Sequence, residues 1–108
     1  MEDKMVRTYV SSDILDYQCN GFPFICHAKE LKEMAKTGDC QVIILDRLEI
    51  NFGYNDIIGI TEYDVNVIPV SGGIKKSHKV EQHYFSSYKE ARSFIEKLLI
   101  THLTENEG

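Results

Sequence analysis

The last quarter of the chain carries apolar residues at the spacing of one helix face. They recur mostly at steps of three or four between polar and charged side chains, at Ala91, Phe94, Ile95, Leu98, Leu99 and Leu103. Just before them, Ser87 and Glu90 stand three positions apart, the spacing of a capping box that satisfies exposed amide groups at a helix start. The pattern predicts a helix over about 87–103.

A second helix is predicted over about 27–37. A narrow apolar stripe runs along it while lysines and glutamates fill the other positions, and the stripe consists of Ala28, Leu31, Met34 and Ala35. Gly38 follows, and glycine commonly ends a helix because it adopts the left-handed conformation without strain.

Between these helices the spacing changes to the period of two that is typical of β-strands. Residues 41–52 predict one strand, with one face formed by Val42, Ile44, Leu48 and Ile50. Residues 57–70 predict another, on which one face is formed by Ile57, Thr61, Tyr63, Val65 and Val67. The connector 53–56 is rich in turn residues, so the two runs form a predicted hairpin. Shorter strands are expected over 79–85 and over Val6–Val10, and residues 12–19 fit a strand or a short helix.

This order of elements predicts an α+β fold. We expect a single small domain over residues 1–108, with a mainly antiparallel sheet of about four strands and two helices packed on one face. The ends, 1–4 and 104–108, are polar and are expected to fray. In the predicted core, the last helix packs against the sheet residues Val42, Ile44, Tyr63, Val65 and Val67 through Ala91, Phe94, Ile95, Leu98 and Leu99.

Composition and charge narrow the classes of function. The chain is 43% apolar and 27% charged, as globular proteins are, and its net charge of −5 disfavours general nucleic-acid binding, which depends on Lys and Arg. The N-terminus lacks the basic start and apolar run of a signal peptide, and no segment approaches the roughly 20 apolar residues that span a bilayer. Three cysteines cannot all pair, which fits a reducing compartment. Together these features predict a cytoplasmic location and no membrane contact.

Catalytic and metal-binding motifs are missing from the sequence. Cys26 precedes the helix predicted over 27–37, where the positive helix end would lower the pKa of its thiol, but a free cysteine is mostly a small buried apolar residue. Cys19, Cys26 and Cys40 lie too far apart to act as paired zinc ligands. We therefore expect no catalytic residue, no metal and no cofactor. A small enzyme built on Cys26 or on a His–carboxylate pair is the least favoured alternative.

Two segments of opposite charge are candidates for binding. The acidic one is the predicted hairpin, where tyrosines among carboxylates suit docking on a protein with a basic surface, through Glu49, Tyr54, Asp56, Glu62, Tyr63 and Asp64. The basic one is a loop in which glycines could turn backbone amides toward an anion beside lysines, and it comprises Gly72, Gly73, Lys75, Lys76, His78 and Lys79. This loop lacks the spacing of a P-loop.

The sequence favours a small acidic binding protein, a regulator or inhibitor that docks on another protein through the hairpin. Abundant Ile and absent Trp indicate an AT-rich genome, and accessory proteins of phages or mobile elements that act on host enzymes fit this profile. The alternative is a small-ligand or nucleic-acid binder that uses the basic loop, although the net charge disfavours nucleic acid. Self-association into a homo-oligomer is compatible with either function.

Overall fold

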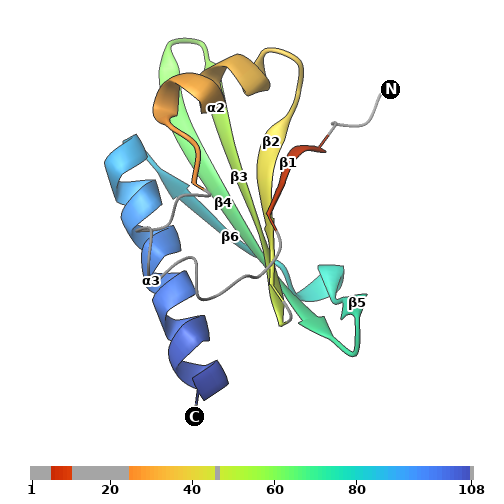
Figure 1. Cartoon of the computed structure of the whole chain (residues 1–108). Helices are drawn as coiled ribbons and strands as arrows, with labels where there is room; N and C mark the ends of the chain where they lie inside the picture. Colours follow the sequence, from red (N-terminus) through yellow and green to blue (C-terminus); the bar gives the residue numbers. More distant parts are fainter. Residues whose placement is uncertain (1–5, 11–24, 46, 108) are drawn as a thin grey trace.

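A curled sheet with two helices makes up the fold (Figure 1). The computed structural model describes residues 6–10, 25–45 and 47–107. In chain order the elements are β1 (Val6–Val10), α2 (Ala28–Ala35), β2 (Cys40–Ile44), β3 (Leu48–Ile57), β4 (Ile60–Ser71), β5 (Ile74–Lys75), the 3₁₀ turn η1 (Ser77–Lys79), β6 (Glu81–Phe85) and α3 (Tyr88–Glu107). The predictions for residues 12–19, for Cys19 and for residues 1–4 fall outside the described residues.

The described strands have the order β1-β2-β3-β4-β6 across the sheet, and β5 adds a short pairing at the far end of β4. The β1–β2 pair is parallel, and the other pairs are antiparallel. β3 and β4 form a long ladder that runs from the pair Leu48–Pro69 to the pair Ile57–Ile60. The prediction of an α+β fold with a mainly antiparallel sheet is thus confirmed.

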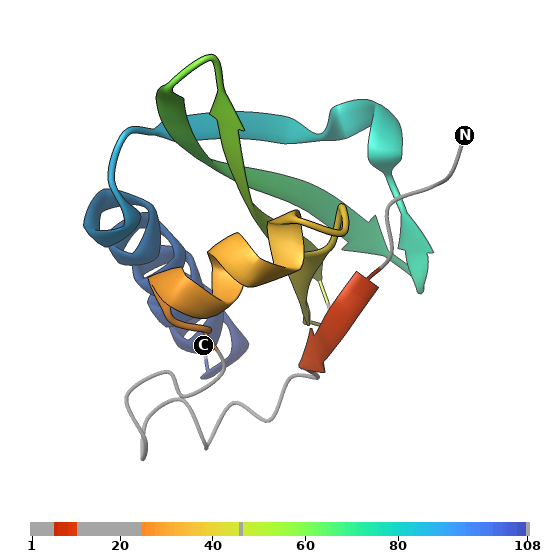
Figure 2. The ribbon, with the colours of Figure 1, turned by 90° about the horizontal axis from the view of Figure 1, so that it is seen from above.

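Both helices cover the same face of the sheet, which curls around them (Figure 2). They share one core, to which α2 contributes Leu31 and α3 contributes Ala91, Ile95 and Leu99. The sheet supplies the buried side chains of Ile43, Ile50, Phe52, Tyr63, Val65 and Val67. Because burying one large apolar side chain stabilises a fold by about 1.5–3 kcal/mol, this shared core holds the helices on the sheet.

The helix starts and ends follow local signals in the sequence. Ser87 Oγ accepts a hydrogen bond from the Glu90 backbone N–H at 3.2 Å, as the predicted cap requires, and α3 continues beyond the predicted end at 103. α2 is slightly shorter than predicted, and Gly38 follows it with a left-handed φ of 80°. Phe94 and Leu98, which we predicted to be buried, lie only partly buried at the edge of the core.

The predicted single strand over 41–52 is wrong, because it consists of two antiparallel strands. The chain reverses after β2, and Ile43 pairs with Ile50 across the β2–β3 hairpin. Cross-strand partners point to the same face of a sheet, so Ile43 joins Ile50 in the core beneath the helices. Val42 and Ile44 alternate with Ile43 and belong to the opposite face, which overturns their predicted packing against α3.

The predicted turn at residues 53–56 is also wrong. β3 continues through Gly53 and Asp56 to Ile57, paired all along with β4, and the chain reverses at Ile58 and Gly59 instead. Glycine, asparagine and aspartate favour turns on their own, but here the cross-strand ladder keeps them extended. This shift places the end of the hairpin at a run of isoleucines.

Candidate functional site

The end of the β3–β4 hairpin exposes large apolar side chains. Ile57 and Ile60 form the last cross-strand pair, and Ile58 and Gly59 make the two-residue turn between them. The isoleucines are 61%, 94% and 69% exposed at positions 57, 58 and 60 respectively. Single exposed apolar residues are common on protein surfaces, whereas a contiguous exposed group is typical of an interaction site. We call residues 57–60 the isoleucine tip.

Ile58 also has a backbone conformation that is unusual for its residue type. Its φ is 51° and that of Gly59 is 79°, so both turn residues are left-handed, as a type I′ turn requires. Such turns normally take Asn, Asp or Gly, and a β-branched residue there is an outlier that costs about 1–2 kcal/mol. Because Ile58 is almost fully exposed, no burial in the folded chain offsets this strain. Neither turn geometry nor core packing accounts for the isoleucine.

Acidic side chains border the isoleucine tip. Asp56 is exposed at the end of β3, and Glu62 lies half-buried near the start of β4. Residues 48–64 include no Lys or Arg, so the charges on the hairpin itself are negative, and the nearest lysines in the adjoining groove, Lys32 and Lys36, belong to the α2 side. A field of one sign steers a partner of the opposite sign during diffusional encounter.

An open groove of about 500 Å³ runs between α2 and the end of β3. It is lined by Lys32, Ala35, Lys36, Tyr54, Asn55, Asp56 and Ile57. Lys32 Nζ lies 5.4 Å from the centre of the Tyr54 ring, a cation–π arrangement. Through Ile57 this groove is continuous with the isoleucine tip, which extends the apolar surface toward α2.

The structure separates the residues of the predicted acidic docking face. Tyr63 is only 5% exposed and packs in the core, where its ring lies tilted against that of Tyr54 at 5.2 Å between ring centroids, so it cannot contact a partner. Glu49 is 9% exposed and accepts hydrogen bonds from Asn51 and from Lys75. Because these side chains are buried or paired, the predicted face does not form as one surface.

The remaining acidic residues of the hairpin differ in how open they are. Both carboxylate oxygens of Asp64 accept hydrogen bonds from Asn55 Nδ2, at 3.0 and 2.8 Å. Asp56 is exposed, and Glu62 is half-buried. Of the predicted docking residues, Asp56 and Glu62 therefore lie beside the isoleucine tip with side chains that reach solvent, and Tyr54 lines the adjoining groove.

The glycines of the basic loop and one of its lysines have roles within the fold itself. Gly72 and Gly73, with φ of 60° and 78°, form the tight turn between β4 and β5. Lys75 Nζ lies 3.4 Å from the Glu49 carboxylate, which offsets one of the positive charges, while His78 and Lys79 are exposed and Lys76 is half-buried. The glycines thus serve the hairpin, and their presence needs no bound anion.

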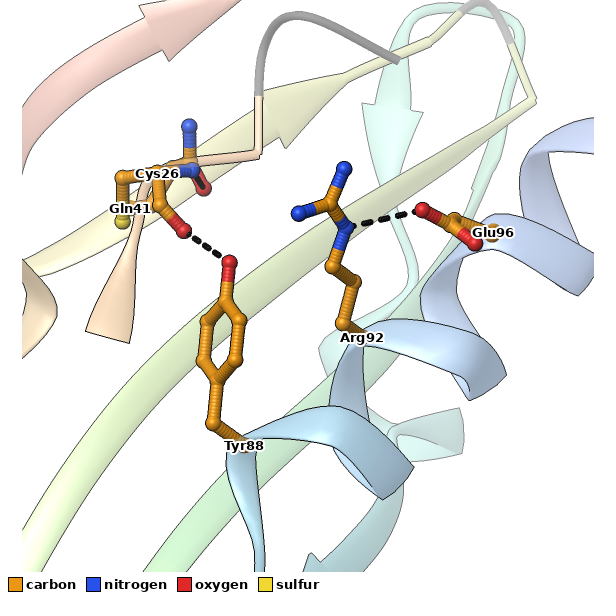
Figure 3. Close-up of polar contacts among 5 residues, drawn as sticks. All are labelled: Cys26, Gln41, Tyr88, Arg92 and Glu96. Atoms are coloured by element: carbon orange, nitrogen blue, oxygen red, sulfur yellow. Dashed lines mark hydrogen bonds and ion pairs between the residues drawn. The ribbon is translucent and has the colours of Figure 1, made fainter. Parts of the chain in front are cut away.

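Cys26 belongs to a polar network that ties the segment before α2 to the rest of the fold (Figure 3). The Tyr88 hydroxyl of α3 donates a hydrogen bond to the Cys26 carbonyl at 2.5 Å, and the Cys26 N–H donates to Gln41 Oε1 of β2 at 3.0 Å. Nearby on α3, Arg92 pairs with Glu96 at 2.8 Å. Both backbone groups of Cys26 are therefore satisfied by side chains from distant parts of the chain.

The surroundings of the Cys26 thiol disfavour its thiolate form. Burial, together with the negative charge of Glu30, raises the pKa of Cys26 to about 11. At neutral pH the thiol is protonated, and the thiolate is the reactive form. Proximity to α2 does not overcome this desolvation, so the catalytic alternative loses its main candidate.

Within residues 6–10, 25–45 and 47–107, no group of three or more His, Cys, Asp or Glu side chains is arranged to hold a metal ion. Neither α2 nor α3 is both long enough and apolar enough to cross a bilayer.

Comparisons of this chain with models of known protein families, with curated proteins and with solved structures gave no match. Function is therefore inferred from the residues and their geometry. The most distinctive feature among them is the isoleucine tip, which sequence reasoning missed because the run Ile57–Ile60 has the composition of a core strand. Gly59 within that run was the signal for a two-residue turn.

Proposed function

We propose that this chain is a non-catalytic binding domain, a regulator or inhibitor that docks on another protein through the end of the β3–β4 hairpin. The observation that carries the proposal is the isoleucine tip, in which three large apolar side chains face solvent at the turn of a long, paired hairpin. Water contact at these side chains is unfavourable, and binding would remove it. The residue type and its exposure are both explained if a partner covers the tip.

The charge of the hairpin indicates the character of the partner. Asp56 and Glu62 flank the apolar side chains, and the hairpin residues 48–64 include no Lys or Arg, while Lys32 and Lys36 line the groove on the α2 side of Asp56. A partner with a basic surface around an apolar contact complements this arrangement. The proposal thus keeps the basic partner that the sequence predicts and moves the contact from the strand face to the tip.

A cytoplasmic setting fits the proposal. Cys26 is a thiol outside any disulfide, and thiols persist in reducing compartments. For an accessory protein of a phage or mobile element, a host enzyme is the expected partner. The basic loop is not needed for this function.

A photo-crosslinking residue at Ile60 tests the proposal in the native cells. The matched control is the same residue at Ile74, an isoleucine that is 62% exposed but lies on β5. We expect position 60 to label one discrete protein and position 74 to leave it unlabelled. The purified partner should then bind Ile60→Ala at least tenfold more weakly than the wild type, and Ile74→Ala equally well. Equal labelling from both positions, or affinities that do not differ, would refute docking through the hairpin.

A further inference from the structure

We infer that the isoleucine tip inserts into a concave apolar pocket of the partner whose rim carries Lys or Arg. This inference rests on the proposed docking function and specifies the shape and chemistry of the receiving site. A hairpin seated there would exclude any other ligand from the pocket, which is how a domain of this size can inhibit a larger protein.

The shape of the tip requires a concave site. Ile58 is 94% exposed, so it touches almost nothing of its own chain, and the turn projects from the end of the β3–β4 ladder (Figure 2). On a flat surface, only one side of such a projection makes contact. A pocket surrounds it and covers Ile57, Ile58 and Ile60 together, because these side chains lie around one turn.

The size of the tip leads to the same conclusion. A stable flat interface buries roughly 800 Å² on each partner, which a four-residue turn does not provide. Ligand pockets are typically concave, mostly apolar and about 300–1,000 Å³ in volume, with a few placed polar groups. Isoleucine side chains on a paired hairpin fit such a pocket, and the carboxylates of Asp56 and Glu62 would meet cations at its rim.

Two other occupants fit the tip less well. In a symmetric dimer the tips of two copies would bring the Asp56 and Glu62 carboxylates of both chains together, and like charges repel. A membrane surface of anionic lipid attracts basic segments, whereas residues 48–64 contain acidic residues and no Lys or Arg. Charge thus favours a protein pocket with a basic rim over either alternative.

The strained turn makes the tip a preorganised ligand. Ile58 holds its left-handed conformation in the free protein, and the ladder on both sides restrains the turn. The tip therefore loses little conformational freedom on binding, which favours affinity from few residues. An isoleucine at this position is unfavourable for the free fold and is expected when its side chain makes the contact.

The test uses the partner identified from position 60 and has two arms. In the first, a photo-crosslinking residue replaces Ile58 in the full chain, and the crosslinked partner residues are mapped. We expect them to line one concave apolar pocket with Lys or Arg at its rim. Crosslinks scattered over a flat or convex surface would overturn the pocket while leaving docking through the hairpin intact.

In the second arm, Ile58→Asn is compared with Ile74→Asn. Asn suits the left-handed turn, so this variant should fold, and we expect its affinity for the partner to fall at least tenfold while that of Ile74→Asn is unchanged. Retained affinity of Ile58→Asn would overturn the inference. A concentration-dependent dimer in gel filtration that Ile58→Asn abolishes, or co-sedimentation of the wild type with phosphatidylglycerol vesicles, would also overturn it in favour of a second copy or a membrane.

Discussion

Two turns of this molecule share a backbone geometry and differ in the residues that adopt it. The β3–β4 hairpin reverses at Ile58–Gly59 and the β4–β5 hairpin at Gly72–Gly73, each between paired strand residues. All four residues have positive φ. The second turn shows that glycine meets this geometry without strain, so the isoleucine of the first turn reflects a requirement other than folding.

The two ends of the β3–β4 ladder also differ, in how far their isoleucines are buried. Ile50 lies under the helices with no exposed surface, whereas Ile60, near the other end of the ladder, is 69% exposed. In this one hairpin, isoleucine is therefore a buried core residue at one end and a solvent-exposed residue at the other. Four measurements test these two differences.

The largest expected effect separates the two ends of the ladder. Ile50→Ala removes side-chain volume from a packed core and should lower the free energy of unfolding by about 2–5 kcal/mol. Ile60→Ala should change it by about 0.5 kcal/mol or less, because the side chain is already hydrated. Urea unfolding of both variants measures the difference. Similar losses would mean that the tip packs against the body of the protein.

An isoleucine at position 72 should give the β4–β5 turn the backbone strain that Ile58 gives the β3–β4 turn. Gly72→Ile should destabilise the fold by about 1–2 kcal/mol, because an isoleucine is forced into a left-handed conformation. A Cβ at Gly72 meets nothing within 4 Å, so the loss would come from the backbone alone. Ser71→Ile, on the neighbouring exposed position, is the control and should be nearly neutral. If Gly72→Ile is as stable as the control, Ile58 is not strained either.

Replacing Ile58 should relieve backbone strain in the β3–β4 turn. Ile58→Asn is expected to raise the free energy of unfolding by about 1 kcal/mol, since Asn tolerates the left-handed conformation far better than a β-branched residue. Thermal or urea unfolding measures the gain. Ile60→Asn replaces an equally exposed isoleucine without positive φ and should give no gain, because Asn is unfavourable in strands. A destabilised Ile58→Asn would show that the side chain supports the free fold after all.

Much of the fold follows from patterns that depend on one element at a time. The apolar face of α3 and its Ser87 cap were predicted because helix spacing and capping are local. On β4, the alternation of Tyr63, Val65 and Val67 placed them correctly in the core. The errors arose where pairing between strands decides the outcome. The turn residues of 53–56 stay extended because β4 pairs with them, and the face of Ile43 depends on its register with Ile50.

The candidate site could be predicted only in part, for a related reason. Charge can be read directly from the sequence, so Asp56 and Glu62 were identified. The burial of Tyr63 and the pairing of Glu49 depend on neighbours from distant segments. An apolar run such as Ile57–Ile60 reads as core unless the position of the turn is known. One shift of the turn, from 53–56 to Ile58–Gly59, converts these residues from a buried strand into an exposed tip.

Reversing the negative charges beside the isoleucine tip should have the smallest effect on stability. It is also the most specific test of what those charges do. Asp56→Lys combined with Glu62→Lys should change the free energy of unfolding by about 0.5 kcal/mol or less, since both side chains reach solvent. Association with the partner should slow about tenfold at low ionic strength, because electrostatic steering acts mainly on the association rate.

Salt provides the control within this experiment. The screening length falls from about 10 Å at 0.1 M to about 3 Å at 1 M, so the rate difference should shrink as salt is added. Lys76→Gln combined with Lys79→Gln alters charge in the basic loop and should leave the rate unchanged. An association rate that is unchanged by the hairpin substitutions but falls strongly when the loop lysines are replaced would contradict docking through the acidic hairpin. It would instead favour an anionic ligand at the basic loop, where Lys79 is exposed.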